Sequence, residues 1–112
     1  MEPVEAIWMV MTTLPDEAGA RHMAHVLLEA GLAACVNRLA PCESEYRWQG
    51  AIEQATEWPL LIKTTAARYP ALEAAIRAAH PYEVPEIVAW PLAAGHAPYL
   101  AWVSAETTPG GR

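Results

Sequence analysis

Two helical patterns, each placed between extended apolar segments, constrain the fold of this chain more than any other feature. In the first, apolar residues recur at intervals of three and four over Ala20–Leu28, which gives a helix one apolar face. The start signal Thr13-Leu14-Pro15-Asp16-Glu17 precedes it, with a cap candidate, an early proline and acids in the first turn, and Gly31 follows as a typical helix stop. The same spacing returns over Tyr69–Ala79 and ends before Pro81. Each pattern predicts a helix that packs one face on a sheet.

Five extended segments surround these helices. The first is an apolar run typical of a strand buried on both faces, and the third alternates between an aromatic and a charged face. A turn at Gln49-Gly50 leads from the third segment into the fourth, where Pro59 predicts a bulge or a sheet edge. The segments are Val4–Thr13, Leu32–Asn37, Ser44–Gly50, Ile52–Thr65 and Glu86–Leu92.

The order of these elements is strand, helix, strand, strand, helix, strand, with Ile52–Thr65 as the third strand and Glu86–Leu92 as the fourth. It predicts an α+β domain of the ferredoxin-like, split βαβ type over residues 1–112. Right-handed crossovers place both helices on one face of a four-stranded antiparallel sheet. A short terminal helix over Pro98–Glu106 is left to cover the opposite face.

Four tryptophans indicate that this covering is incomplete. Trp8, Trp48, Trp58 and Trp90 all fall on predicted strands, and they cannot all lie under two helices rich in alanine. Hydrophobic residues make up 54% of the 112 residues, which is high for one small domain. The pattern predicts that the rest of the sheet is buried by self-association.

The charge of the chain limits its partners. A formal net charge of −6 argues against binding to nucleic acid or to an anionic membrane. The sequence shows no signal peptide and no apolar window of the roughly 20 residues that would span a bilayer, so we expect a soluble, cytoplasmic protein. The two cysteines, Cys35 and Cys42, are expected to be reduced, because seven extended residues hold them about 23 Å apart.

The densest group of reactive side chains lies between the second helix and the last strand. His80, Tyr82, Glu83 and Glu86 follow one another here, and two prolines fix the backbone between them. This composition favours a binding site, although an exposed helix-to-strand connector has the same pattern.

Other ionisable residues have two interpretations. Lys63, the only lysine, is either a cation at the end of a strand or the partner of an anion. His22 and His25 have the spacing of metal ligands, but they lie opposite the apolar stripe, which favours a solvated face.

The sequence resembles the CutA divalent-cation tolerance family over nearly its whole length. The motifs that carry the resemblance occur in the family's order. They are Thr13-Leu14-Pro15-Asp16, Leu32-Ala33-Ala34-Cys35-Val36-Asn37, Ser44-x-Tyr46-x-Trp48-x-Gly50, Leu60-Leu61-Ile62-Lys63-Thr64, His80-Pro81-Tyr82-Glu83-Val84-Pro85-Glu86 and Tyr99-Leu100-x-Trp102-Val103.

The resemblance implies a cytoplasmic homotrimer of ferredoxin-like subunits, similar in layout to the PII signalling proteins. It also implies a role in tolerance of copper and other divalent cations, with no established catalytic reaction. The metal site proposed for the family uses a cysteine near the end of the first strand and two histidines before Pro-Tyr. Here Thr12 and Ala79 replace the cysteine and the first histidine, and only His80 matches.

Four functions follow from these residues. In the first, a non-catalytic trimer binds a divalent cation or a small ligand at its subunit clefts. His80, Glu83 and Glu86 would be the metal ligands, and Lys63, Tyr46, Trp48 and Tyr82 would line the cleft. Copper would be the preferred ion, with a Kd of about micromolar or weaker. The alternatives are a PII-like trimer that signals a small molecule, an enzyme with His80 as general base, or a scaffold for another protein.

Overall fold

The computed structural model describes residues 6–108, which form five strands and three helices. In chain order these are β1 (Ile7–Leu14), α1 (Glu17–Glu29), β2 (Cys35–Arg38), β3 (Cys42–Trp48), β4 (Ala51–Thr65), α2 (Tyr69–Ala79), β5 (Ile87–Pro91) and α3 (Ala97–Thr107). Val4 and Glu5, which the sequence assigns to the first strand, lie outside the described residues. Within residues 6–108, no helix has the length and apolar character that a membrane span requires.

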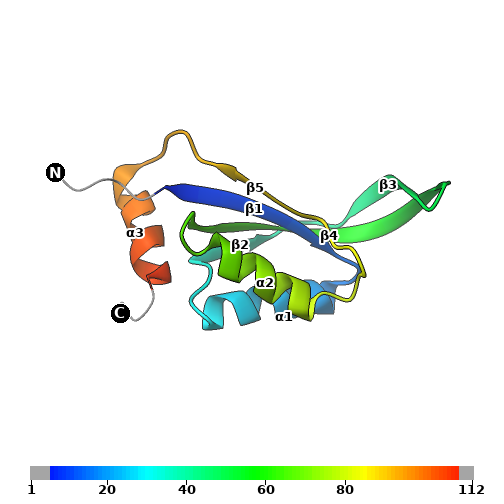
Figure 1. Ribbon diagram of the computed structural model, residues 1–112, viewed down its shortest axis with the longest axis horizontal. Coiled ribbons are helices and arrows are strands. Elements are labelled where there is room, and N and C mark those ends of the chain that lie inside the picture. Colours follow the sequence, from blue (N-terminus) through cyan, green and yellow to red (C-terminus); the bar gives the residue numbers. More distant parts are fainter. Residues whose placement is uncertain (1–5, 109–112) are drawn as a thin grey trace.

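The longest strand, β4, organises the sheet. On one side, β4 pairs antiparallel with β1. On its other side, the first part of β4 pairs with β3 and the later part pairs with β2. The strand order is β2-β4-β1-β5, and β3 pairs with β4 outside this path. Helices α1 and α2 lie on the same side of the strands, whereas α3 lies at one end of the sheet (Figure 1). The predicted α+β fold with an antiparallel sheet is therefore confirmed.

The number of strands differs from the prediction. The sheet has five strands rather than four, because the chain breaks between β2 and β3. Three residues, 39–41, stand here opposite only two, Trp58 and Pro59. This extra residue is a bulge next to Pro59, at the place where the sequence predicts one. Neither Pro59 nor Pro41 has an N–H group, so a regular ladder cannot continue through this point.

The core lies between the sheet and the two helices. Val10 and Leu14 of β1 point to this side, and they pack with residues of α1, α2, β4 and the connection between α1 and β2 that are at most 8% exposed. These are Ala20, Met23, Leu27, Leu32, Ala33, Leu60, Ile62, Leu72 and Ile76. The predicted apolar stripe of α1 is wrong at one position. Leu28 is 42% exposed, since it lies about 100° around the helix from the buried Leu27.

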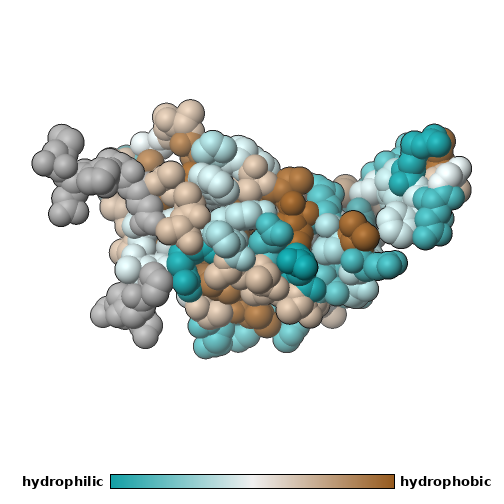
Figure 2. Space-filling model, in the orientation of Figure 1, coloured by the Kyte–Doolittle hydropathy of each residue, from teal (hydrophilic) through white to brown (hydrophobic). Residues whose placement is uncertain are grey.

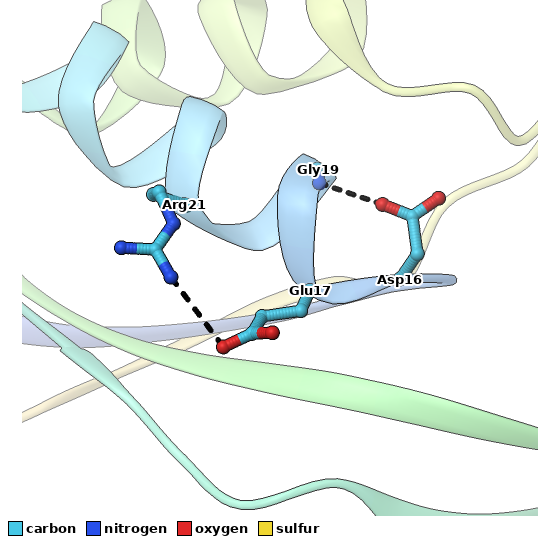
Figure 3. Close-up of polar contacts among 4 residues, drawn as sticks. All are labelled: Asp16, Glu17, Gly19 and Arg21. Carbon is cyan, nitrogen blue, oxygen red and sulfur yellow. Dashed lines mark hydrogen bonds and ion pairs between the residues drawn. The ribbon is translucent and has the colours of Figure 1, made fainter.

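Local signals set the ends of α1, and the helix begins within the start signal that the sequence shows, with Asp16 as its cap rather than as an acid of the first turn. The Oδ1 atom of Asp16 accepts a hydrogen bond from the N–H of Gly19 at 2.6 Å and caps the helix (Figure 3). Glu17 and Arg21, which lie one helical turn apart, form an exposed ion pair at 3.5 Å (Figure 3). At the other end, Gly31 has a φ of +70°, the left-handed conformation that glycine adopts most readily.

The tryptophans divide between the two faces of the sheet. Trp58 packs against the core, and the Trp8 ring lies 5.4 Å from the Tyr69 ring of α2. Trp48 and Trp90 remain 38% and 42% exposed. Hydrophobic surface is visible on the body of the molecule in Figure 2, whereas the hairpin formed by β3 and β4 is mainly hydrophilic. As predicted, the two helices do not cover all of the strand tryptophans.

Candidate functional site

A cleft with a volume of about 520 Å³ lies between the β3–β4 hairpin and the segment that follows α2. Five glutamates and three aromatic residues line it, and no lysine, arginine or histidine belongs to this described lining. The lining residues are Thr13, Ser44, Glu45, Tyr46, Trp48, Glu53, Glu57, Tyr82, Glu83, Val84 and Glu86. The cleft is therefore an acidic site with aromatic walls.

The turn between β3 and β4 determines which residues of the hairpin face the cleft. Gln49 and Gly50 both have positive φ angles, 50° and 84°, as a two-residue type I′ turn requires. The turn fixes the register, so that Tyr46 stands opposite Glu53. Because residues two apart on a strand share a face, Tyr46 and Trp48 present their rings on the same side of β3.

The opposite wall is the segment that carries Tyr82, Glu83 and Glu86, and His80 holds it in place. The Nδ1 atom of His80 accepts a hydrogen bond from the N–H of Tyr82 at 3.1 Å. Its Nε2 atom lies 2.7 Å from the carbonyl oxygen of Thr13, at the end of β1. Since Nδ1 is an acceptor, the proton of the neutral ring is on Nε2, which donates to Thr13.

Within the described subunit, this geometry argues against His80 as a metal ligand. Both ring nitrogens are used inside the subunit, and the side chain is only 9% exposed. A metal ion or a substrate proton needs a free lone pair on one nitrogen, which this arrangement does not offer. We assign His80 a positioning role, in which it ties the cleft segment to β1.

Tyr82 and Glu57 connect the two walls across the cleft. The hydroxyl group of Tyr82 donates a hydrogen bond to Oε2 of Glu57 at 2.8 Å. Burial raises the pKa of Tyr82 to about 12, and the hydrogen bond to Glu57 and its negative charge add to the effect. Tyr82 therefore stays protonated and remains a donor at neutral pH.

The raised pKa of Tyr82 predicts a loss of stability in alkali. The folded state holds this proton up to a pH of about 12, whereas an ordinary tyrosine has a pKa of 10.0. The stabilisation is thus complete below pH 10 and should disappear as the pH rises from 10 to about 12. Urea unfolding across this range should show a steeper loss in the wild type than in Tyr82→Phe. Equal slopes in the two proteins would contradict the prediction.

Lys63 is not among the residues that line this cleft of the subunit. Its Nζ atom donates a hydrogen bond to Oδ1 of Asn37 and lies 4.0 Å from Sγ of Cys35. In the sheet, Lys63 stands opposite Met9 of β1. The residue of β1 that lines the cleft is Thr13, four residues farther along the strand, so the backbones of Met9 and Thr13 are about 13 Å apart. This distance depends on strand register, which the spacing of residues in the sequence does not reveal.

The other candidate residues are not part of the cleft lining. Thr12 is fully buried and Ala79 is exposed at the end of α2. His22 and His25 are exposed on α1, where His25 contacts Glu29 at 2.8 Å, so the prediction of a solvated face is confirmed. Both cysteines are free.

Sequence reasoning missed Thr13 and three of the five glutamates in the cleft. The Gln49-Gly50 turn contained part of the missing signal. A two-residue turn places Glu53 opposite Tyr46 and Glu57 opposite Cys42, which brings both carboxylates to the aromatic face of β3. Tyr46, Trp48, Tyr82, Glu83 and Glu86, which the sequence analysis singles out, all line this cleft of the subunit.

Comparison with known proteins supports the resemblance. The family model of the CutA1 divalent ion tolerance protein matches residues 8–106. The divalent-cation tolerance protein CutA of Thermus thermophilus is 46% identical over 99 residues, which are 88% of this chain and 96% of that protein.

Solved structures agree with the sequence comparison. The structure of the divalent cation tolerance protein from Thermus thermophilus superposes with a TM-score of 0.89 at 45% identity, covering 91% of this chain and 99% of that one. CutA1 from Oryza sativa gives a TM-score of 0.91 at 33% identity, with 94% and 96% covered. Sequence and structure agree over almost the entire length, and this chain belongs to the CutA1 divalent ion tolerance family.

Proposed function

We propose that this protein is a non-catalytic, cytoplasmic homotrimer of ferredoxin-like subunits that contributes to divalent-cation tolerance by binding cations in its acidic clefts. The observation that carries the proposal is the lining of the cleft, with five glutamates and no basic side chain among the described residues. Such a surface attracts cations and repels anions. The family to which the chain belongs is named for tolerance of divalent ions, which agrees with this electrostatic preference.

The exposed face of the sheet supports self-association. Val88 pairs with Met11 and Trp90 pairs with Met9, on the side opposite the core residue Val10. Val88 and Trp90 are 46% and 42% exposed, although both stand on a regular strand. Large apolar side chains on one sheet face are typical of an interface. A three-fold arrangement would bring this face against a different patch of the next subunit.

One described subunit does not form a tight metal site. Within residues 6–108, no three histidine, cysteine, aspartate or glutamate side chains are grouped closely enough to hold a metal ion. Copper prefers imidazole and thiolate donors, whereas the described cleft offers mainly carboxylates. We therefore expect divalent ions to be held weakly, through the charge of Glu83 and Glu86 and the other carboxylates, with a Kd of about micromolar or weaker.

The proposal is tested by removing two charges from the cleft. We expect a Glu83→Gln/Glu86→Gln variant to bind copper(II) about ten-fold more weakly than the wild type in calorimetry, because two carboxylates are lost. A Glu29→Gln/Glu106→Gln variant removes the same charge from helices away from the cleft and should bind like the wild type. Native mass spectrometry should show three protomers. Equal affinity in both variants, or a monomer, would disprove the proposal.

A further inference from the structure

The carboxylates of the cleft are spread along a line rather than gathered around a point. Glu53 and Glu57 stand four residues apart on the same face of β4, which separates their backbones by about 13 Å. Glu83 and Glu86 extend the acidic surface on the opposite wall. A metal ion needs several ligands at one point, and the described residues offer no such group. This distribution matches an extended ligand that carries more than one positive charge.

The walls of the cleft also contain features that a metal ion does not use. The rings of Tyr46 and Trp48 are 41% and 38% exposed on one face of β3, and Tyr82 and Val84 add apolar surface opposite them. Aromatic faces attract organic ammonium groups through cation–π interactions, and they pack well against methylene chains. A volume of about 520 Å³ lies within the usual range for sites that hold small organic molecules.

Glu57 provides an independent indication of a cationic ligand. It lines the cleft but is only 7% exposed, and its side chain accepts a hydrogen bond from the neutral hydroxyl group of Tyr82. The two ion pairs found within residues 6–108 are both on α1, so Glu57 is not paired with a cation in this part of the chain. A buried carboxylate without a counter-charge is costly, and a cation entering the cleft would reduce that cost.

We propose that the cleft binds a linear organic cation, a diamine or polyamine whose ammonium groups are joined by short methylene chains. This inference rests on the proposed function, since it names the class of cation for the same cleft. The ammonium groups contact the separated carboxylates, one of them near Glu57. The methylene chains lie against Tyr46 and Trp48.

Calorimetry with spermidine as the probe tests this inference, with magnesium and copper(II) chloride titrated at the same ionic strength. We expect spermidine to bind about ten-fold more tightly than magnesium, and putrescine, which has one charge fewer, to lie between them. Trp48→Ala should weaken spermidine binding about five-fold and copper binding much less, because carboxylates rather than the ring hold the metal ion. Trp102→Ala, which removes a similarly exposed ring (43% against 38%) on α3 outside the cleft, is the matched control and should have no effect.

A second variant keeps the test valid if Trp48→Ala disturbs the hairpin. Glu57→Gln preserves the shape of the side chain and its acceptor for Tyr82, and it should also weaken spermidine binding about five-fold. If spermidine binds no more tightly than magnesium, or ignores both variants, the inference is wrong. If copper binding still depends on Glu83 and Glu86, the proposed function stands although the inference fails. If copper binding does not depend on these glutamates, the proposed function and the inference both fail.

Discussion

Replacing His80 with alanine should destabilise the protein by about 3 kcal/mol. The change leaves the carbonyl group of Thr13 and the N–H group of Tyr82 without their partner, and each unsatisfied buried group costs about 1–3 kcal/mol. The side chain is 9% exposed, so its removal also leaves a cavity. Urea unfolding at one fixed protein concentration measures the loss, because the stability of an oligomer depends on concentration.

Matched variants separate the two hydrogen bonds of His80. In His80→Gln, the side chain can place an N–H group near the position of Nε2. In His80→Asn, it can place an acceptor near the position of Nδ1. Each variant should therefore recover part of the stability that His80→Ala loses. His22→Ala removes an exposed histidine from α1 and should change the stability by less than about 0.5 kcal/mol. If His80→Ala is as mild as His22→Ala but abolishes copper binding, His80 is a ligand and its positioning role is wrong.

Replacing Val88 with lysine should convert the proposed trimer to monomers. Val88 lies in β5 next to Met11, on the sheet face that we place in the subunit interface. A tight interface of roughly 2,000 Å² would bury the new ammonium group without a partner. The penalty is several kcal/mol per charge, and closed three-fold symmetry applies it three times. Sedimentation equilibrium at micromolar concentration should then find one protomer mass in place of three.

Leu28→Lys is the control for this experiment. Leu28 is 42% exposed, close to the 46% of Val88, but it lies on α1 on the other side of the sheet. Lysine near the end of a helix is well tolerated, so this variant should remain a trimer. If Val88→Lys also remains a trimer, the assembly does not use this face. If the wild type itself is a monomer, the proposal of a trimer fails.

Much of the fold is visible in the sequence because its signals are local. Gly31 stops α1, Pro81 follows the end of α2, and Gln49-Gly50 turns the hairpin, and each of these acts on the residues beside it. The break between β2 and β3 is harder to predict. Pro59 indicates an irregularity, but the extra residue lies on the partner strand, at 39–41.

The candidate site is predicted less completely because its decisive contacts are long-range. The chemistry of His80 suggests a ligand, but its partner Thr13 lies 67 residues earlier in the chain. Glu57 reaches Tyr82 across 25 residues. The charge of Lys63 suggests a place in the cleft, and strand register puts it elsewhere. Spacing within one segment identifies Tyr82, Glu83 and Glu86, whereas the carboxylates on β4 require the pairing of strands.

The hairpin of β3 and β4 has a consequence for the way the cleft assembles. Beyond the bulge it is a ribbon of two strands, and such a ribbon has little stability of its own in water. In a dissociated subunit, amide hydrogens near Glu53 should exchange with solvent quickly, while those near Ile62 in the same strand stay protected. If a neighbouring subunit of the proposed trimer packs against the hairpin, this wall of the cleft becomes ordered only when subunits associate. Dilution of the protein would weaken ligand binding, and the cellular abundance of the chain would set its sensitivity to cations.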